Sequence, residues 1–352
     1  MSLPPGEIPL GAMRFNSDSS KLEYWNGSAW FQIHTFSPNL GDYTNSTDSL
    51  GGVRGLFAGR FNDTSNNATI DYVTISTQGN ATDYGDLINS IYFYAGMCSS
   101  NRRWVHFGGA PTNPSTQMQY GQFASTGNGI DFGNLTQHTH YNPSGVSNQT
   151  RGIRMGGAAV PTGSHNNIEY WTFETLSDSI DFGDLVTASR FAMSANSPTR
   201  GLISGGSDGP SAVTSIQFVT IATLGNAQTF GDVGQGLPLN DGGNGACSNV
   251  TRGLFGGGSP GYVSTVATVQ MATLGNSSEF GDLSVARGYI GSTASATRAV
   301  FGGGYYTSPS TAYVNTIDYM NIATGGTAVD FGDRTVQGSY LSGSSNGHGG
   351  LG

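Results

Sequence analysis

The strongest constraint on the fold is an internal repeat of about 49 residues that occurs six times. A motif close to Arg-Gly-Leu-Phe-x-Gly-Gly recurs in fixed phase and begins with an arginine in every unit. The six arginines are Arg54, Arg103, Arg151, Arg200, Arg252 and Arg298, with spacings of 49, 48, 49, 52 and 46 residues. A fixed period of this length indicates an array of similar units that pack on one another.

Each unit predicts four short antiparallel strands. The stretch after the arginine is apolar, and a second run, such as 69–75, is rich in β-branched and aromatic residues on both faces, as in strands between neighbouring sheets. Gly-Asn pairs, for example Gly79-Asn80, then predict a tight hairpin. An aromatic-glycine-acid motif follows, with Tyr84, Phe132, Phe182, Phe230, Phe280 or Phe331 as its aromatic residue and Asp86, Asp184, Asp232, Asp282 or Asp333 closing it. We expect an all-β protein.

Composition excludes several other classes of protein. The chain has 55 glycines among 352 residues, and an interior glycine costs a helix roughly 0.5–1 kcal/mol relative to alanine. A net charge of −9 with only 14 Lys and Arg residues argues against a partner nucleic acid bound through its phosphates. No run of about 18 apolar residues and no secretory leader are visible, so we expect no membrane insertion and no export signal.

These units resemble kelch repeats, in which a glycine doublet ends the second strand and a bulky aromatic residue lies on the fourth. The doublets here are Gly108-Gly109, Gly156-Gly157, Gly205-Gly206, Gly257-Gly258 and Gly303-Gly304. The resemblance covers residues 54–352 and implies a β-propeller of four-stranded blades. Two features depart from the family: the aromatic residue is never Trp, and the first unit has Gly59-Arg60 in place of a doublet.

The ring is expected to have six blades and to close through its C-terminus. The first unit begins at its second strand, Arg54, whereas residues 338–343 occupy the phase of a first strand. The tail would complete the first blade and cover both open sheet edges. The alternative is a seventh, degenerate blade built from residues 36–53 and the tail.

Residues 1–35 lie outside the repeat and predict a small β-meander, with Asn26-Gly27 as its hairpin turn. The pattern G-x-x-R-[FY]-N…LEYW-x-G-x-x-W resembles a short module of tailed-bacteriophage virion proteins, especially fibres of cyanobacterial phages. The resemblance implies an element for virion attachment or oligomerisation, with Arg14, Phe15, Tyr24, Trp25 and Trp30 as its contact residues. It also implies other virion proteins as partners, several copies per assembly, and a location in the virion after synthesis in the bacterial cytoplasm. Residues 36–53 are interpreted as the linker.

Few chemical motifs remain once the repeat is removed. Cys98 and Cys247 hold equivalent positions three units apart, too far for a disulfide, so both should be free thiols. His138 and His140 would share a strand face, but no third ligand is apparent, so no metal and no cofactor is predicted. The repeated acids could bind Ca²⁺; the favoured interpretation is a structural ladder in which they cap turns or pair with the repeated arginines. We expect no enzyme, since cleavage of a polysaccharide would need two converging carboxylates.

Loops between the second and third strands, and those between blades, diverge among the units and should share one face. Variable polar loops on a rigid scaffold are where recognition normally resides. The candidate contact residues are Tyr141, His138, His140, Tyr262, Tyr305, Tyr306 and Tyr313. The sequence therefore predicts a structural protein of the virion, of fibre or appendage type, that is attached by its N-terminus and displays a propeller for recognition of a host-surface glycan or protein. The alternative is a non-adhesive decoration protein of capsid, neck or tail that contacts other virion subunits.

Overall fold

The computed structural model describes residues 8–16, 21–33, 53–62, 65–91, 93–110, 115–139, 141, 143–159, 163–209, 211–234, 237, 245–308 and 310–351. The chain divides into two compact units, Met1–Tyr43 and Thr44–Gly352. The predicted linker 36–53, apart from Val53, lies outside the described residues. Within the described ranges, no helix has the length and apolarity that crossing a membrane requires.

The smaller unit contains a three-stranded antiparallel meander of β1 (Met13–Asn16), β2 (Lys21–Trp25) and β3 (Trp30–Ile33). The predicted turn at Asn26-Gly27 is confirmed. The Asn26 carboxamide oxygen accepts hydrogen bonds from the backbone N–H of Ser28 at 2.9 Å and of Ala29 at 2.8 Å, and Gly27 takes a φ of 98°. This side-chain bond fixes the turn locally.

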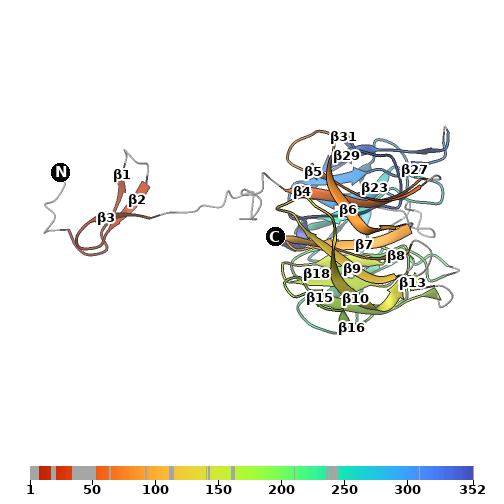
Figure 1. Ribbon diagram of the computed structural model, residues 1–352, viewed down its shortest axis with the longest axis horizontal. Helices are drawn as coiled ribbons and strands as arrows, with labels where there is room; N and C mark the ends of the chain where they lie inside the picture. Colours follow the sequence, from red (N-terminus) through yellow and green to blue (C-terminus); the bar gives the residue numbers. More distant parts are fainter. Residues whose placement is uncertain are drawn as a thin grey trace. The chain divides into compact units, whose positions relative to one another are not determined.

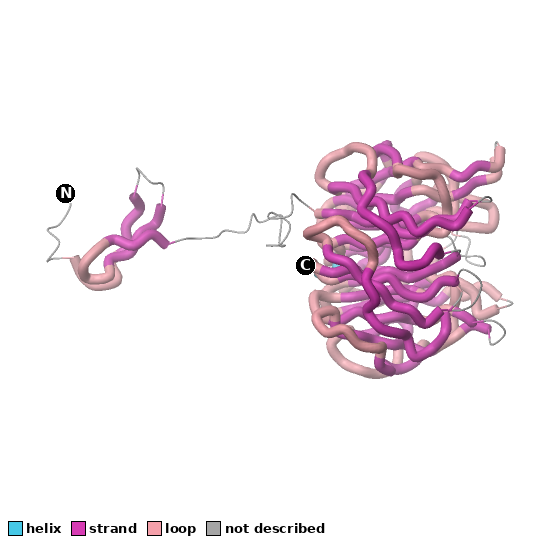
Figure 2. The backbone as a smooth tube through the Cα atoms, viewed as in Figure 1, coloured by secondary structure: helices cyan, strands magenta, loops and turns pink. Residues whose placement is uncertain are grey.

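The larger unit is all-β (Figures 1 and 2). Its described residues form six sheets of four antiparallel strands, one of which gains a short parallel fifth strand. From the inner to the outer strand they are β32 (Ser342–Ser345), β4 (Arg54–Asn62), β5 (Ser65–Thr74), β6 (Thr82–Ile91); β7 (Phe93–Ser99), β8 (Arg103–Ala110), β9 (Ser115–Gln122), β10 (Ile130–Thr139); β11 (Ser144–Ser147), β12 (Arg151–Met155), β15 (Asn167–Thr172), β16 (Ile180–Asp184); β17 (Met193–Asn196), β18 (Arg200–Ser204), β19 (Ser215–Thr220), β20 (Gln228–Asp232); β21 (Gly245–Ser248), β22 (Arg252–Gly256), β23 (Thr265–Gln270), β24 (Ser278–Asp282); and β25 (Gly291–Ala294), β26 (Arg298–Gly302), β29 (Thr316–Asn321), β31 (Val329–Asp333).

Short additional strands decorate this set of sheets. Strand β30 (Gly326–Thr327) pairs in parallel with β24, which joins the fifth and sixth units. Two two-stranded hairpins, β13 (Ala158–Ala159) with β14 (Gly163–Ser164) and β27 (Tyr305–Tyr306) with β28 (Ala312–Tyr313), extend the connections between second and third strands. A short 3₁₀ turn, η3 (Gly349–Leu351), follows β32.

The first sheet takes its inner strand from the C-terminus, since β32 pairs with β4 in the register Ser342↔Ala58 to Ser345↔Gly55. The tail is thereby used in the first sheet and does not form a seventh unit. Each inner strand contacts the next in the order β32, β7, β11, β17, β21 and β25, and β25 in turn contacts β32. The six sheets thus surround a common centre.

The repeated arginines connect each sheet to the next. Each guanidinium donates from Nη1 to a backbone carbonyl beyond the third strand of the following sheet, for example Arg103 to Phe173 at 2.6 Å. The sixth sheet makes the same bond to the first, from Arg298 to Ile75 at 2.9 Å. The guanidinium also stacks on an aromatic ring of its own sheet, as with Arg103 over Tyr120 at 5.3 Å. The same hydrogen bond to the following sheet is made by Arg54, Arg151, Arg200 and Arg252.

The expected pairing of these arginines with the motif acids is wrong. Among the described residues, the ion pairs involve other arginines, and the motif acids act through their backbone N–H instead. Asp86 N–H, for example, donates to Asn128 Oδ1 of the next sheet at 3.1 Å. Equivalent bonds are made by Asp184, Asp232 and Asp333, while the Asp282 carboxylate accepts from Ser264 at 2.8 Å. The partners of these guanidinium groups are instead backbone carbonyls of the following sheet, at 2.6–3.0 Å.

The prediction that the Gly-Asn pairs form tight hairpins is wrong. These pairs contact the neighbouring sheet instead. Strand β5 ends at Thr74 and β6 begins only at Thr82, so the pair lies in a wider connection. A Cβ on Gly332 of the sixth sheet would lie 2.5 Å from the carbonyl oxygen of Gly79 in the first. Glycine is needed there because two backbones meet without room for a side chain.

A buried polar side chain on the third strand adds a further bond between sheets. Gln119 Oε1 accepts from Ile88 N at 2.7 Å, and Glu169, Gln217 and Asp318 make equivalent bonds. The fifth sheet has Ala267 at this position, and there Ser277 Oγ accepts the corresponding bond from Gly234 N at 2.6 Å. Where the position is acidic, a buried arginine lies beside it: Glu169 with Arg154, Asp318 with Arg287, and Asp71 with Arg334. The glutamine, glutamate and aspartate oxygens thereby satisfy backbone N–H groups of the neighbouring sheet.

Hydrophobic clusters fill the spaces between neighbouring sheets. The motif aromatic residues belong to them and meet the third strand edge to face, as Phe182 does with Tyr170 at 6.0 Å. Cys98 and Cys247 are buried and free, which confirms the prediction. Burial raises the pKa of both thiols, that of Cys247 to about 12, so neither is a nucleophile at neutral pH.

Candidate functional site

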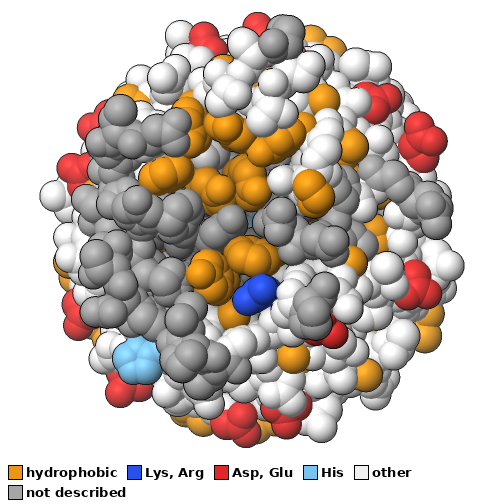
Figure 3. All heavy atoms as spheres, turned by 90° about the vertical axis from the view of Figure 1, so that its right-hand side faces the viewer, with side chains coloured by type: hydrophobic (Ala, Val, Ile, Leu, Met, Phe, Trp, Pro, Cys, Tyr) orange, Lys and Arg blue, Asp and Glu red, His pale blue; other side chains and the backbone are white. Residues whose placement is uncertain are grey.

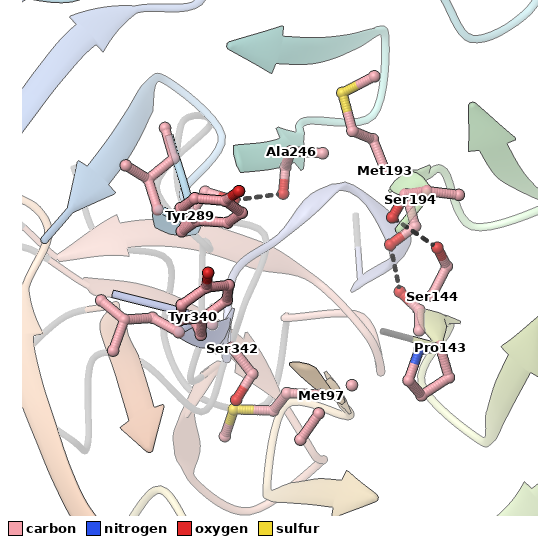
Figure 4. A pocket seen from close by; sticks show the side chains of 17 residues that line it. Met97, Pro143, Ser144, Met193, Ser194, Ala246, Tyr289, Tyr340 and Ser342 are labelled. Carbon is pink, nitrogen blue, oxygen red and sulfur yellow. Dashed lines mark hydrogen bonds between the residues drawn. The ribbon is translucent and has the colours of Figure 1, made fainter. Parts of the chain in front are cut away.

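A funnel opens at the centre of the six sheets, with about 590 Å³ of empty space including its mouth. Its wall consists of the starts of the inner strands, with Met97, Ser144, Met193, Ser194 and Ser342 among the lining residues. Figure 4 shows Tyr289 and Tyr340 side by side on one side of this space, with Met193, Ser144 and Pro143 across from them.

Below the funnel the space continues as a shaft of about 380 Å³ that reaches His348. The C-terminal segment fills its far end. His348 Nε2 lies 2.8 Å from the Ser99 carbonyl oxygen and donates to it, while Nδ1 accepts from Gly350 N–H at 3.1 Å and lies 3.2 Å from Asn196 Nδ2. Leu351 is 2% exposed. The central space is therefore open at the funnel and blocked by the chain's own tail at the other end.

Aromatic rings form a closed cycle at one side of the mouth. Tyr289 and Tyr340 lie closest, with ring centroids 4.2 Å apart. The remaining neighbours along the cycle are 4.8–6.3 Å apart, in the order Tyr340, Phe61, Tyr313, Tyr305, Tyr262 and back to Tyr289. Figure 3 shows hydrophobic side chains gathered around the centre of this face, with acidic side chains mostly toward its edge.

A second aromatic group includes Tyr141 and Phe191, with centroids 5.4 Å apart. The Arg190 guanidinium lies over both rings, at 5.6 and 5.4 Å, and donates to the Gly209 carbonyl oxygen at 3.4 Å. This arginine places a positive charge beside the aromatic residues of this face.

Three aromatic residues of these groups share an unusual backbone conformation. Phe191, Tyr289 and Tyr340 have φ values of 59°, 58° and 60° and occupy the same position, two residues before the inner strand. The left-handed conformation costs an ordinary side chain roughly 1–2 kcal/mol, and glycine would avoid that cost. Three large rings therefore occupy equivalent positions at which a glycine would be less strained.

The described residues that line the funnel carry no formal charge: they are small, apolar, serine or tyrosine. Its serine hydroxyls already donate their protons to backbone carbonyls, as Ser194 does to Gly145 at 2.9 Å and Ser292 to Ala246 at 2.6 Å. Ser144 donates likewise to Ala192 at 3.0 Å. Each oxygen is left with lone pairs, so the wall presents hydrogen-bond acceptors.

The structure brings together four of the residues predicted as contacts, since Tyr262, Tyr305 and Tyr313 belong to the cycle and Tyr141 to the second group. Tyr306 is half-buried in the β27–β28 hairpin and lies outside the funnel lining. His138 is exposed on the outer strand β10, and His140 lies outside the described residues. Sequence reasoning missed Phe61, Phe191, Tyr289 and Tyr340. Aligning the units on their inner strands would have shown an aromatic residue at one position in four of the six, namely Tyr94, Phe191, Tyr289 and Tyr340.

The described residues contain no group of three or more His, Cys, Asp or Glu side chains that could hold a metal ion. The funnel and shaft linings hold no carboxylate.

The meander of the smaller unit has two different faces. The register places Met13, Phe15, Leu22, Tyr24 and Phe31 on one face, and Phe15 and Phe31 are 66% and 49% exposed. On the other face, Arg14 pairs with Glu23 at 2.8 Å and covers the Trp30 ring at 4.3 Å; Trp25 lies 5.5 Å from Trp30. The predicted attachment residues are thus divided between an exposed apolar face and a self-contained polar one.

No family model and no curated protein matches this chain. Among solved structures, the protein described in "Structure of YjhT" is similar in fold, with a TM-score of 0.59 at 8% sequence identity. The match covers 72% of this chain and 87% of the other. At this identity the likeness concerns the fold alone, and it supports a propeller-like all-β architecture.

Proposed function

We propose that this chain is a structural protein of a tailed-phage particle, of fibre or appendage type. Its small N-terminal unit attaches it to other virion proteins, and its six sheets form a kelch-like propeller that displays a recognition site for the host surface. The role is binding and not catalysis. The site is the aromatic mouth of the central funnel.

One observation carries this proposal: the chain enters the larger unit at one end of the central space, and the aromatic mouth lies at the other end. The chain enters at Val53, whose carbonyl accepts from Ile75 N–H at 2.8 Å, and Asn346 close to the C-terminus bonds the next residue, Arg54. Both lie at the blocked end of the shaft. The aromatic mouth lies at the opposite end, and Figure 1 shows the C-terminus and β27 on opposite sides of the sheets.

The exposed apolar face of the N-terminal meander supports attachment through that unit. So small a unit buries little apolar surface of its own, and exposed rings such as Phe15 and Phe31 gain by being covered. Exposed aromatic side chains on so small a unit are typical of a protein–protein contact.

The test is the binding of labelled full-length chain to cyanobacterial host cells and to phage particles lacking the protein. We expect saturable binding to cells, and binding to particles that is lost in the Phe15→Ser/Phe31→Ser variant. The same variant should still bind cells, because its mouth is unchanged. Binding to particles without any binding to cells would overturn the recognition role and favour a decoration protein. Binding to neither would overturn the virion role as a whole.

A further inference from the structure

The geometry of the funnel points to one class of ligand, and we propose that it binds the uncharged pyranose end of a glycan. This inference deepens the proposed recognition function and rests on it for its biological meaning. It concerns which chemistry the mouth accepts and how the ligand enters.

The polar wall selects a ligand that donates hydrogen bonds. The hydroxyl protons of Ser144, Ser194 and Ser292 are committed to the Ala192, Gly145 and Ala246 carbonyl oxygens. A hydroxyl whose hydrogen is already donated to a carbonyl can only accept a further hydrogen bond. A carboxylate or phosphate placed here would therefore face the lone pairs of these oxygens and be repelled. A sugar hydroxyl can donate to it.

The charges around the mouth argue against cationic ligands, which could also donate hydrogen bonds to this wall. An ammonium group would also suit acceptors and aromatic rings, but the described residues that line the funnel include no carboxylate to balance its charge. The Arg190 guanidinium, stacked on Tyr141 and Phe191, would repel a cation that approaches the mouth. Uncharged hydroxyl-rich molecules satisfy both conditions.

The aromatic side of the mouth suits the C–H face of a pyranose. Tyr289 and Tyr340 stack on each other at 4.2 Å, and the Tyr289 hydroxyl donates to Ser259 Oγ at 3.0 Å, which fixes its ring. A preordered ring loses little entropy when a ligand packs on it. The apolar side chains of Met97 and Met193 complete the wall.

The blocked shaft determines the mode of entry. Since η3 and His348 fill the far end, a long polymer cannot pass through. The ligand therefore enters end-on, as the terminal residue of a glycan chain.

Saturation-transfer NMR on the full-length chain tests this proposal, with methyl gluco-, galacto- and mannopyranosides, the matching uronates, and choline as probes. We expect at least one neutral hexoside to bind and the uronates and choline not to. Tyr340→Leu should weaken binding about tenfold by removing the aromatic face. Ser194→Ala, a smaller change in a half-buried side chain, should also weaken it by removing an acceptor. Leu274→Ala, on an exposed connection between third and outer strands, is the control and should bind normally.

Three outcomes would overturn the proposal: no hexoside binds, a uronate or choline binds equally well, or hexoside binding survives both Tyr340→Leu and Ser194→Ala. Comparison with cell binding separates this inference from the proposed function. Cell binding without hexoside binding contradicts only the ligand class. Hexoside binding without cell binding contradicts only the host-recognition role.

Discussion

At the scale of single residues, three aromatic residues at the mouth adopt a backbone conformation that is unfavourable for residues with a side chain. Phe191, Tyr289 and Tyr340 take the left-handed conformation at equivalent positions. Ordinary β positions favour alanine over glycine, because glycine loses more entropy on folding. At these three positions the preference should be reversed, since glycine alone adopts the conformation without strain.

We predict that Phe191→Gly is more stable than Phe191→Ala by about 1 kcal/mol in urea unfolding. The control is Ile130, an exposed residue on β10 without a left-handed backbone, where alanine should be more stable than glycine. An alanine variant equal to or more stable than the glycine variant at Phe191 would show that the conformation carries no cost.

A second residue-scale prediction concerns acid. Burial lowers the pKa of His348 from 6.5 to about 4, and Nδ1 already accepts from the Gly350 N–H. Below pH 6.5 the unfolded chain takes up a proton that the folded chain does not, so stability should fall as the pH drops toward 4. The loss is on the order of 3 kcal/mol, at about 1.4 kcal/mol per pKa unit.

His348→Gln should reduce this pH dependence in urea titrations at a series of pH values. Buried His106, whose pKa is lowered to about 3 by burial, contributes in the same direction and should account for part of the remaining slope. A His348→Gln variant with an unaltered slope between pH 6.5 and 4 would contradict the proposed protonation state.

Sequence reasoning at this scale found the aromatic residues in variable loops but not those in the repeat. Tyr262, Tyr305 and Tyr313 stood out because their loops diverge. Tyr289 and Tyr340 were missed because the sequence does not show a residue's backbone conformation. It also does not show which residues of other sheets lie beside it. The sequence also does not show that the serine hydroxyls of the funnel already donate hydrogen bonds to backbone carbonyls.

At the scale of the elements, one repeated arginine bonds each sheet to the next. Arg103 donates to the Phe173 carbonyl at 2.6 Å and stacks on Tyr120. A hydrogen bond from a charged group contributes about 1.5–3 kcal/mol, and stacking of a cation on a ring adds about 0.5–1 kcal/mol at an exposed site.

We predict that Arg103→Ala lowers the free energy of unfolding by about 1–3 kcal/mol. The adjacent Arg102 is exposed and provides a matched control, since Arg102→Ala removes the same charge and should change stability by less than about 0.5 kcal/mol. Equal effects of the two substitutions, measured by urea unfolding, would mean that net charge and not the bond to the next sheet is what matters.

The repeat showed that these arginines recur in phase, but it assigned them the wrong partners. Spacing along the chain gives the position of a residue within its own unit. It does not reveal which groups of the neighbouring unit lie opposite, and there a backbone carbonyl, invisible in a sequence pattern, lies closer than the expected carboxylate. The Gly-Asn pairs were misjudged for the same reason, because their role is a contact with the adjacent sheet.

At the scale of the whole molecule, the period and the strand phase were sufficient to predict an all-β chain of four-stranded sheets. The pairing of β32 with β4 makes the two ends of the repeat depend on each other. Without β32, the first sheet would expose the edge of β4 and the neighbouring inner strands β7 and β25 would lose a contact.

We predict that removal of residues 338–352 destroys the cooperative unfolding of the larger unit and causes aggregation. Thermal unfolding followed by circular dichroism and size-exclusion chromatography measure this. Removal of residues 1–43, a longer segment in a separate unit, should leave the transition intact. A cooperative, monomeric product of the C-terminal truncation would contradict a ring that depends on its last strand.

The central claim is that the aromatic mouth recognises the host surface, and cell binding by matched full-length proteins tests it most directly. Labelled wild-type chain and a Tyr289→Ser/Tyr340→Ser variant, shown by circular dichroism to retain its fold, would be titrated onto host cells. The account predicts saturable binding by the wild type and its loss in the variant. Equal binding by both proteins, or binding by neither, would contradict it.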